Sequence, residues 1–156
     1  MTKIAVGKKA ARFTLNDQHG EPVSRDDEKG KRIVLSFHPL AWTPVCSKQM
    51  KALEENRSAL QEENAVAFGV SVDPSPSKLA WAKELGIRET RLLSDFWPHG
   101  AVARLFGIFR EEEGFSERAV ILLDEERVAR FVKVYPLAEL PDLDEVLGAL
   151  RKMRGK

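Results

Sequence analysis

The sequence predicts an α/β fold in which a mixed central sheet carries helices on both faces and follows an N-terminal hairpin. Two apolar segments without polar alternation, residues 33–37 and 65–72, are typical of strands that are buried on both faces. Two later apolar segments, 118–123 and 128–134, are neighbours in sequence and are expected to pair antiparallel. An amphipathic pattern over 143–153 predicts a closing helix.

The first half of the chain adds a hairpin and two helices to this frame. Short apolar segments at 13–15 and 21–23 flank a polar turn, which indicates a hairpin. A helical pattern runs from about Pro44 to Gln61. A second helix is expected up to Leu85, with Ser75 as its N-cap and a stop at Gly86.

The second half is predicted to continue with short elements. A strand is expected over 91–94 and a short helix over 101–106, before Gly107. The segment 108–110 is predicted to pair with 118–123 around an acidic turn, as a second hairpin.

Length and composition indicate one domain over residues 1–156. Lys and Arg total 25 against 24 Asp and Glu, so the charge gives no attraction to nucleic acid or to a membrane surface. No stretch resembles a signal peptide or a membrane span. The single cysteine forbids an intramolecular disulfide, and a free thiol fits a reducing compartment such as the cytoplasm.

That cysteine, Cys46, lies in the segment around which the chain is organised, SFHPLAWTPVCSKQM over residues 36–50. Thr43 and Pro44 have the residue types of an N-cap and a first helical residue, which places Cys46 in the first turn. The free N–H groups and the dipole at a helix start favour a thiolate over a thiol. The Thr43 hydroxyl is expected near the sulfur, and Pro39 is expected to form a rigid wall beside it.

Several residues keep two interpretations at this stage. A lone cysteine is most often a small buried apolar residue, but the coincident strand, loop and helix start favour a reactive thiol. Arg118 is either a strand-end residue in water or a cation directed at the site, which spacing cannot decide. Phe96 and Trp97 either pack inside or form a partner surface, and His99 is expected to be structural.

The segment Pro39-Leu40-Ala41-Trp42-Thr43-Pro44-Val45-Cys46 matches a P-x-x-x-T-x-x-C motif. With the strings at 93–100 and 118–124, it resembles the peroxiredoxins, the alkyl hydroperoxide reductase and thiol-specific antioxidant family. The resemblance is strongest to the one-cysteine, AhpE-like type. The chain departs from the family at 10–13, where Ala-Ala-Arg-Phe replaces Ala-Pro-x-Phe.

The resemblance implies a thioredoxin-like fold and a thiol peroxidase activity. It implies Cys46 as the peroxidatic cysteine, with Thr43 and Arg118 as its catalytic partners. Three further residues, matched to the motif or close to it, are expected to contact the substrate: Pro39, Val45 and Gln49. No metal, haem or flavin cofactor is implied.

The expected reaction reduces hydrogen peroxide and organic hydroperoxides through a sulfenic acid at Cys46. An external thiol has to recycle it: a low-molecular-weight thiol, a glutaredoxin-like protein or thioredoxin. A homodimer or higher homo-oligomer is expected. An alternative is a peroxide sensor or chaperone that uses the same cysteine without turnover. A disulfide reductase is a weak third reading, because Thr43 stands where a C-x-x-C motif has its first cysteine.

Overall fold

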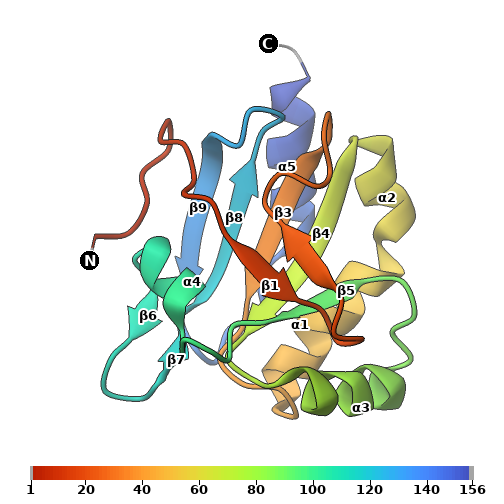
Figure 1. Ribbon diagram of the computed structural model, residues 1–156. Helices are drawn as coiled ribbons and strands as arrows, with labels where there is room; N and C mark the ends of the chain where they lie inside the picture. The colour runs from red at the N-terminus through yellow and green to blue at the C-terminus, as the bar shows by residue number, and fades with distance from the viewer. Residues whose placement is uncertain (1, 155–156) are drawn as a thin grey trace.

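The computed structural model describes residues 2–154 and contains a seven-stranded sheet in the order β2-β1-β5-β4-β3-β8-β9 (Figure 1). These strands are β1 (Thr14–Asn16), β2 (Pro22–Ser24), β3 (Arg32–Phe37), β4 (Ala65–Ser71), β5 (Arg91–Ser94), β8 (Arg118–Leu123) and β9 (Ala129–Tyr135). A separate two-stranded sheet joins β6 (Phe109–Arg110) to β7 (Phe115–Ser116).

The centre of the sheet is parallel and its flank is antiparallel. β3 pairs parallel with β4, opposing Leu35 to Phe68, and β4 pairs parallel with β5. On its other side β3 pairs antiparallel with β8, which opposes Phe37 to Ala119, and β8 pairs antiparallel with β9. All six residues of β3 and all six of β8 are buried. The apolar runs of both strands predict this for their apolar residues, and Arg32, Ser36 and Arg118 are buried with them. The predicted mixed sheet is thereby confirmed.

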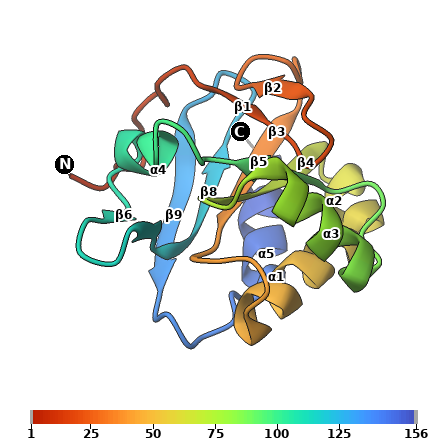
Figure 2. The same cartoon turned by 60° about the horizontal axis from the view of Figure 1, so that its bottom comes forward.

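Helices cover the two faces of the sheet unequally (Figure 2). They are α1 (Pro44–Glu55), α2 (Arg57–Glu62), α3 (Ser75–Leu85), α4 (Ala101–Leu105) and α5 (Leu143–Met153). One core cluster packs Met50, Trp81 and Leu150, from α1, α3 and α5, against one face. The other cluster packs Phe106, after α4, with Leu15 and Val23 of the N-terminal hairpin.

The predicted helix over 44–61 is wrong in one respect, because it breaks at Asn56 into α1 and α2. The Asn56 side chain donates from Nδ2 to the Ala52 carbonyl at 2.8 Å, a local bond that competes with helix propagation. α3 begins at Ser75 with Pro74 in the cap position, so the predicted cap is displaced by one residue. It ends at Gly86, which is left-handed at φ 73°, as expected.

The second predicted hairpin is also wrong in its pairing. β6 pairs with β7, whereas β8 lies in the main sheet between β3 and β9. The acidic turn therefore closes the small sheet, and its end brings the chain to Arg118 at the start of β8. Over residues 2–154, none of the helices has the length and apolar character needed to cross a bilayer.

Candidate active site

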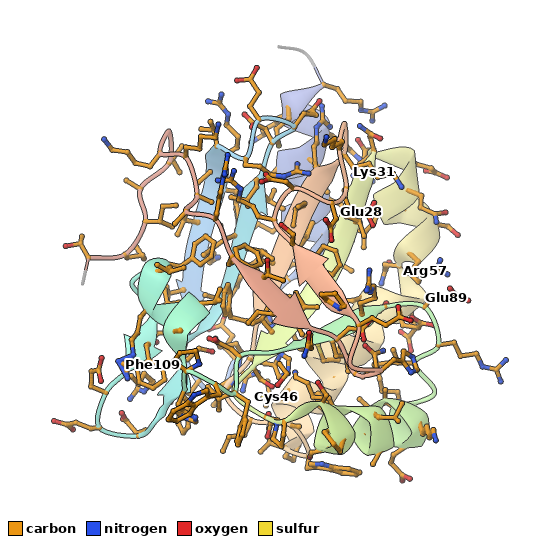
Figure 3. The ribbon with its side chains drawn as sticks, in the orientation of Figure 1. Glu28, Lys31, Cys46, Arg57, Glu89 and Phe109 are labelled. Atoms are coloured by element: carbon orange, nitrogen blue, oxygen red, sulfur yellow. The ribbon has the colours of Figure 1, made fainter. Side chains whose placement is uncertain are left out.

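The loop from β3 to α1 positions Cys46 at the third residue of α1 (Figure 3). Two bonds tie this loop to its surroundings. The Ala41 amide donates to Asp73 Oδ2 at 2.8 Å, and Trp42 Nε1 donates to Ser77 Oγ at 3.1 Å. Trp42 has a φ of 73°, a left-handed conformation that is uncommon for a large side chain and concentrates at functional sites.

Arg118 lies against the sulfur. Its Nη1 is 3.2 Å from Cys46 Sγ and donates to Gln49 Oε1 at 2.8 Å. Gln49 in turn donates from Nε2 to Ser36 Oγ at 2.7 Å and to the Phe37 carbonyl at 3.0 Å, so its amide orientation is fixed. The structure therefore favours the second interpretation of Arg118: it is 4% exposed and directed at the thiol from a neighbouring strand.

The other predicted site residues lie at the helix start. Thr43 occupies the N-cap position, but its hydroxyl donates to the Leu40 carbonyl at 2.8 Å and does not cap the helix. Within residues 2–154 it has no hydrogen bond to the sulfur. Pro39 is buried and Val45 is half-buried. The N–H groups of Val45 and Cys46 have no acceptor in the described part of the chain, as expected for a first turn.

Cys46 has no exposed surface. Its side chain belongs to the cluster formed by Met50, Trp81 and their neighbours, yet a guanidinium contacts it from the other side. The sulfur is thus buried in a mixed environment and not in purely apolar packing.

Two buried side chains near Cys46 are absent from the sequence prediction: His38 and Lys78, whose Nε2 and Nζ atoms are 3.4 Å apart. Both have no exposed surface. Burial, the nearby Lys78 cation and Arg118 depress the pKa of His38 well below its usual value. Burial lowers the pKa of Lys78 to about 7, against an opposing attraction from Asp73, Cys46 and Asp95. The sequence does contain a signal for the burial of Lys78. This lysine precedes Trp81 and Ala82 by three and four residues and so shares the apolar face of α3 with them.

A cysteine at a helix start, a guanidinium on its sulfur and a mixed sheet of this topology define a thiol-based oxidoreductase of thioredoxin-like fold.

Comparison with known proteins gives the family. Residues 6–132 match the model of the AhpC/TSA family. The chain is 35% identical over 140 residues to alkyl hydroperoxide reductase E from Mycobacterium tuberculosis, covering 89% of this chain and 91% of the relative.

Two solved structures are similar throughout. The structure of peroxidoxin BcpB from Mycobacterium tuberculosis has a TM-score of 0.85 at 28% identity and covers 99% of both chains. The reduced 2-Cys peroxiredoxin from Plasmodium vivax has a TM-score of 0.88 at 27% identity, covering 97% of this chain and 83% of the other. The chain belongs to the AhpC/TSA family, the peroxiredoxins, which are thiol-dependent peroxidases.

Proposed function

We propose that the protein reduces hydrogen peroxide and organic hydroperoxides to water and alcohols with Cys46 as the peroxidatic residue. The observation that carries this proposal is the contact of Arg118 Nη1 with Cys46 Sγ at 3.2 Å. A guanidinium at this distance stabilises the thiolate and can bond an oxygen bound beside it. Gln49 holds the guanidinium in place at 2.8 Å.

The proposed step is a displacement at oxygen. The thiolate attacks the outer hydroxyl oxygen of the hydroperoxide, an S–O bond forms and the O–O bond breaks. The sulfur loses two electrons and becomes a sulfenic acid, and the leaving oxygen takes up one proton to give water or an alcohol. Arg118 and the N–H groups of Val45 and Cys46, which have no acceptor within residues 2–154, stabilise the negative charge that moves onto the oxygens.

Thr43, Pro39 and Val45 are proposed to orient the peroxide. The Thr43 hydroxyl proton is engaged by the Leu40 carbonyl, so its lone pairs are free to accept a hydrogen bond from the peroxide O–H. Pro39 has no N–H group and would limit water next to the sulfur. Val45 contributes the edge of the site from the first helical turn.

The oxidised Cys46 needs an external thiol, because the chain has no other cysteine. The attacking thiol forms a mixed disulfide and releases water, and a second thiol then restores Cys46. A low-molecular-weight thiol, a glutaredoxin-like protein or thioredoxin could each supply these electrons. A cysteine that has to stay reduced suits the cytoplasm, which we propose as the compartment.

A homodimer is proposed as the assembly. Phe96 and Trp97 are 48% and 81% exposed, and large exposed aromatic side chains are enriched at protein interfaces.

Stopped-flow mixing with one equivalent of hydroperoxide tests the function. Wild type is expected to give a rapid fluorescence change and Cys46→Ser none. Sustained peroxide consumption with a thiol reductant supports an enzyme. A single oxidation that captures a partner without turnover would instead support the sensor or chaperone, and equal rates in wild type and Cys46→Ser would exclude both.

A further inference from the structure

Lys78 on α3 is a fully buried ammonium-bearing side chain. None of the ion pairs within residues 2–154 includes it, and its hydrogen-bond partner is the neutral ring of His38 at 3.4 Å. A buried cation without a directly paired carboxylate is costly. Its position on α3, where an apolar residue would pack at lower cost, therefore requires a reason.

Charged groups from several elements lie around Lys78. Its own electrostatic partners are Asp73 after β4, Cys46 on α1 and Asp95 after β5. Arg118 on β8 adds a like charge that acts on His38. Lys78 therefore lies in a cluster that contains the thiol.

The two carboxylates of this cluster also accept hydrogen bonds from neighbouring groups. Asp73 Oδ2 accepts from the Ala41 amide at 2.8 Å and from Ser71 Oγ at 2.6 Å. Asp95 accepts the amides of Val102 and Ala103 at 3.0 and 2.9 Å, and burial raises its pKa. Each carboxylate thus also holds a neighbouring backbone segment. Asp73 exerts the largest attraction on Lys78, and the Cys46 sulfur exerts the next.

We propose that Lys78, held by His38, is a positioning residue of the peroxidase site whose ammonium stabilises the Cys46 thiolate from α3, in addition to Arg118 on β8. This inference rests on the proposed function. Two cations then stabilise the thiolate: Arg118, which contacts the sulfur, and Lys78, which acts through the protein interior.

The geometry of His38 fits the task of holding an ammonium. Its Nδ1 is 3.4 Å from the Ser36 carbonyl, and a carbonyl can only accept, so Nδ1 carries the proton. Nε2 then presents a lone pair toward Lys78 Nζ. The ring also packs on Trp81 at a centroid distance of 5.4 Å. The depressed pKa of His38 keeps the ring neutral, so it orients the ammonium without adding a second charge.

The same arrangement makes the reaction dependent on the charge of Lys78. A thiolate and an ammonium in one buried cluster attract each other. The reactive form contains both charges. The rate is therefore expected to fall at alkaline pH as Lys78, whose pKa is lowered to about 7, becomes neutral.

Lys78→Met tests this inference, with Lys83→Met as the matched control because Lys83 is an exposed lysine of the same helix. The second-order rate constant for hydrogen peroxide is measured by stopped flow from about pH 5 to 9. Lys78→Met is expected to react roughly ten- to hundredfold more slowly at neutral pH. The fall in rate at alkaline pH is expected to disappear.

His38→Gln and His38→Leu form the second pair of variants. Gln keeps an acceptor and is expected to retain most of the wild-type rate, whereas Leu removes it and is expected to resemble Lys78→Met. A folded Lys78→Met with the wild-type rate and the wild-type pH profile overturns the inference. If Lys78→Met does not fold, the wild-type protein decides: a rate constant that does not fall at alkaline pH overturns the inference. An inactive Cys46→Ser alongside either result leaves the proposed function intact.

Discussion

Arg118 and Cys46 are 72 positions apart in the sequence, and Nη1 of the arginine lies 3.2 Å from the sulfur. The contact exists because β8, which begins at Arg118, pairs with β3, which leads into the loop and helix that carry Cys46. The antiparallel register opposes Phe37, the last residue of β3, to Ala119, so Arg118 is brought to the start of α1.

Arg118→Met is expected to lower the rate constant for peroxide reduction by about 10²- to 10³-fold, the effect of removing one preorganised donor from an oxyanion site. Arg118→Lys is expected to recover only part of it, because an ammonium cannot donate to the sulfur and to Gln49 in the same planar geometry. Stopped-flow rates measure both. Arg130→Met, an exposed arginine on the adjacent strand, is the control and is expected to react like wild type.

Gln49→Leu is expected to lower both stability and rate. It leaves the buried guanidinium without one acceptor and the Phe37 carbonyl without its donor. A buried unsatisfied group costs about 1–3 kcal/mol, so the midpoint of urea unfolding is expected to fall. Gln49→Glu keeps an acceptor for Arg118 and is expected to lose less activity. A Gln49→Leu protein with wild-type midpoint and rate would show that the amide does not hold Arg118.

Thr43→Val is expected to react more slowly than Thr43→Ser, because serine keeps the hydroxyl and valine keeps only the shape. The loss of one neutral hydrogen bond to the peroxide corresponds to about 0.5–1.5 kcal/mol, or roughly two- to tenfold in rate. Unfolding midpoints of the two variants serve as the control. Equal rates for valine and serine would assign Thr43 to loop structure alone, through its bond to the Leu40 carbonyl.

The buried Lys78 gives stability a defined pH dependence. Its pKa is about 7 in the folded protein, below the 10.5 of the free side chain, so the unfolded chain binds more protons between these values. The free energy of unfolding contributed by this group therefore rises as pH increases from about 7 toward 10.5. Urea unfolding across this range is expected to show the rise in wild type and Lys83→Met but not in Lys78→Met. A rise that persists in Lys78→Met would contradict this origin.

Trp97→Lys is expected to weaken the proposed homodimer, because it places a charge on an aromatic side chain that is 81% exposed in the single chain. Sedimentation velocity at several concentrations measures the assembly. Val6→Lys is the control, since Val6 is an exposed apolar residue at 59% outside this aromatic patch. A Trp97→Lys protein that sediments like wild type would place the interface elsewhere.

Much of the fold could be predicted from local patterns. The bounds of β5 and α5 agree with the predicted 91–94 and 143–153, and the uninterrupted apolar strand at 65–71 is indeed parallel to its neighbours. The break at Asn56 could not be predicted, because the helical pattern of the sequence continues through it.

The part of the candidate site formed by residues close in sequence could be predicted, whereas the contacts between distant segments could not. Thr43, Pro44 and Cys46 lie within one short segment of sequence, so the helix start could be deduced from residue types. The approach of Arg118 depends on strand pairing across the sheet, which spacing does not encode. The burial of Lys78 depends on the packing of α3 against His38, which follows β3. Lysine side chains are usually exposed, so this burial could not be predicted from the residue type.

The complete burial of the Cys46 sulfur has a kinetic consequence for recycling. A small oxidant needs a narrow passage, whereas the sulfur of an incoming thiol has to align with the oxidised residue along the bond that breaks. The reduction of oxidised Cys46 is therefore expected to require an opening of the segment from Pro39 to Val45. At high thiol concentration, the rate of reduction is expected to level off at the rate of this opening.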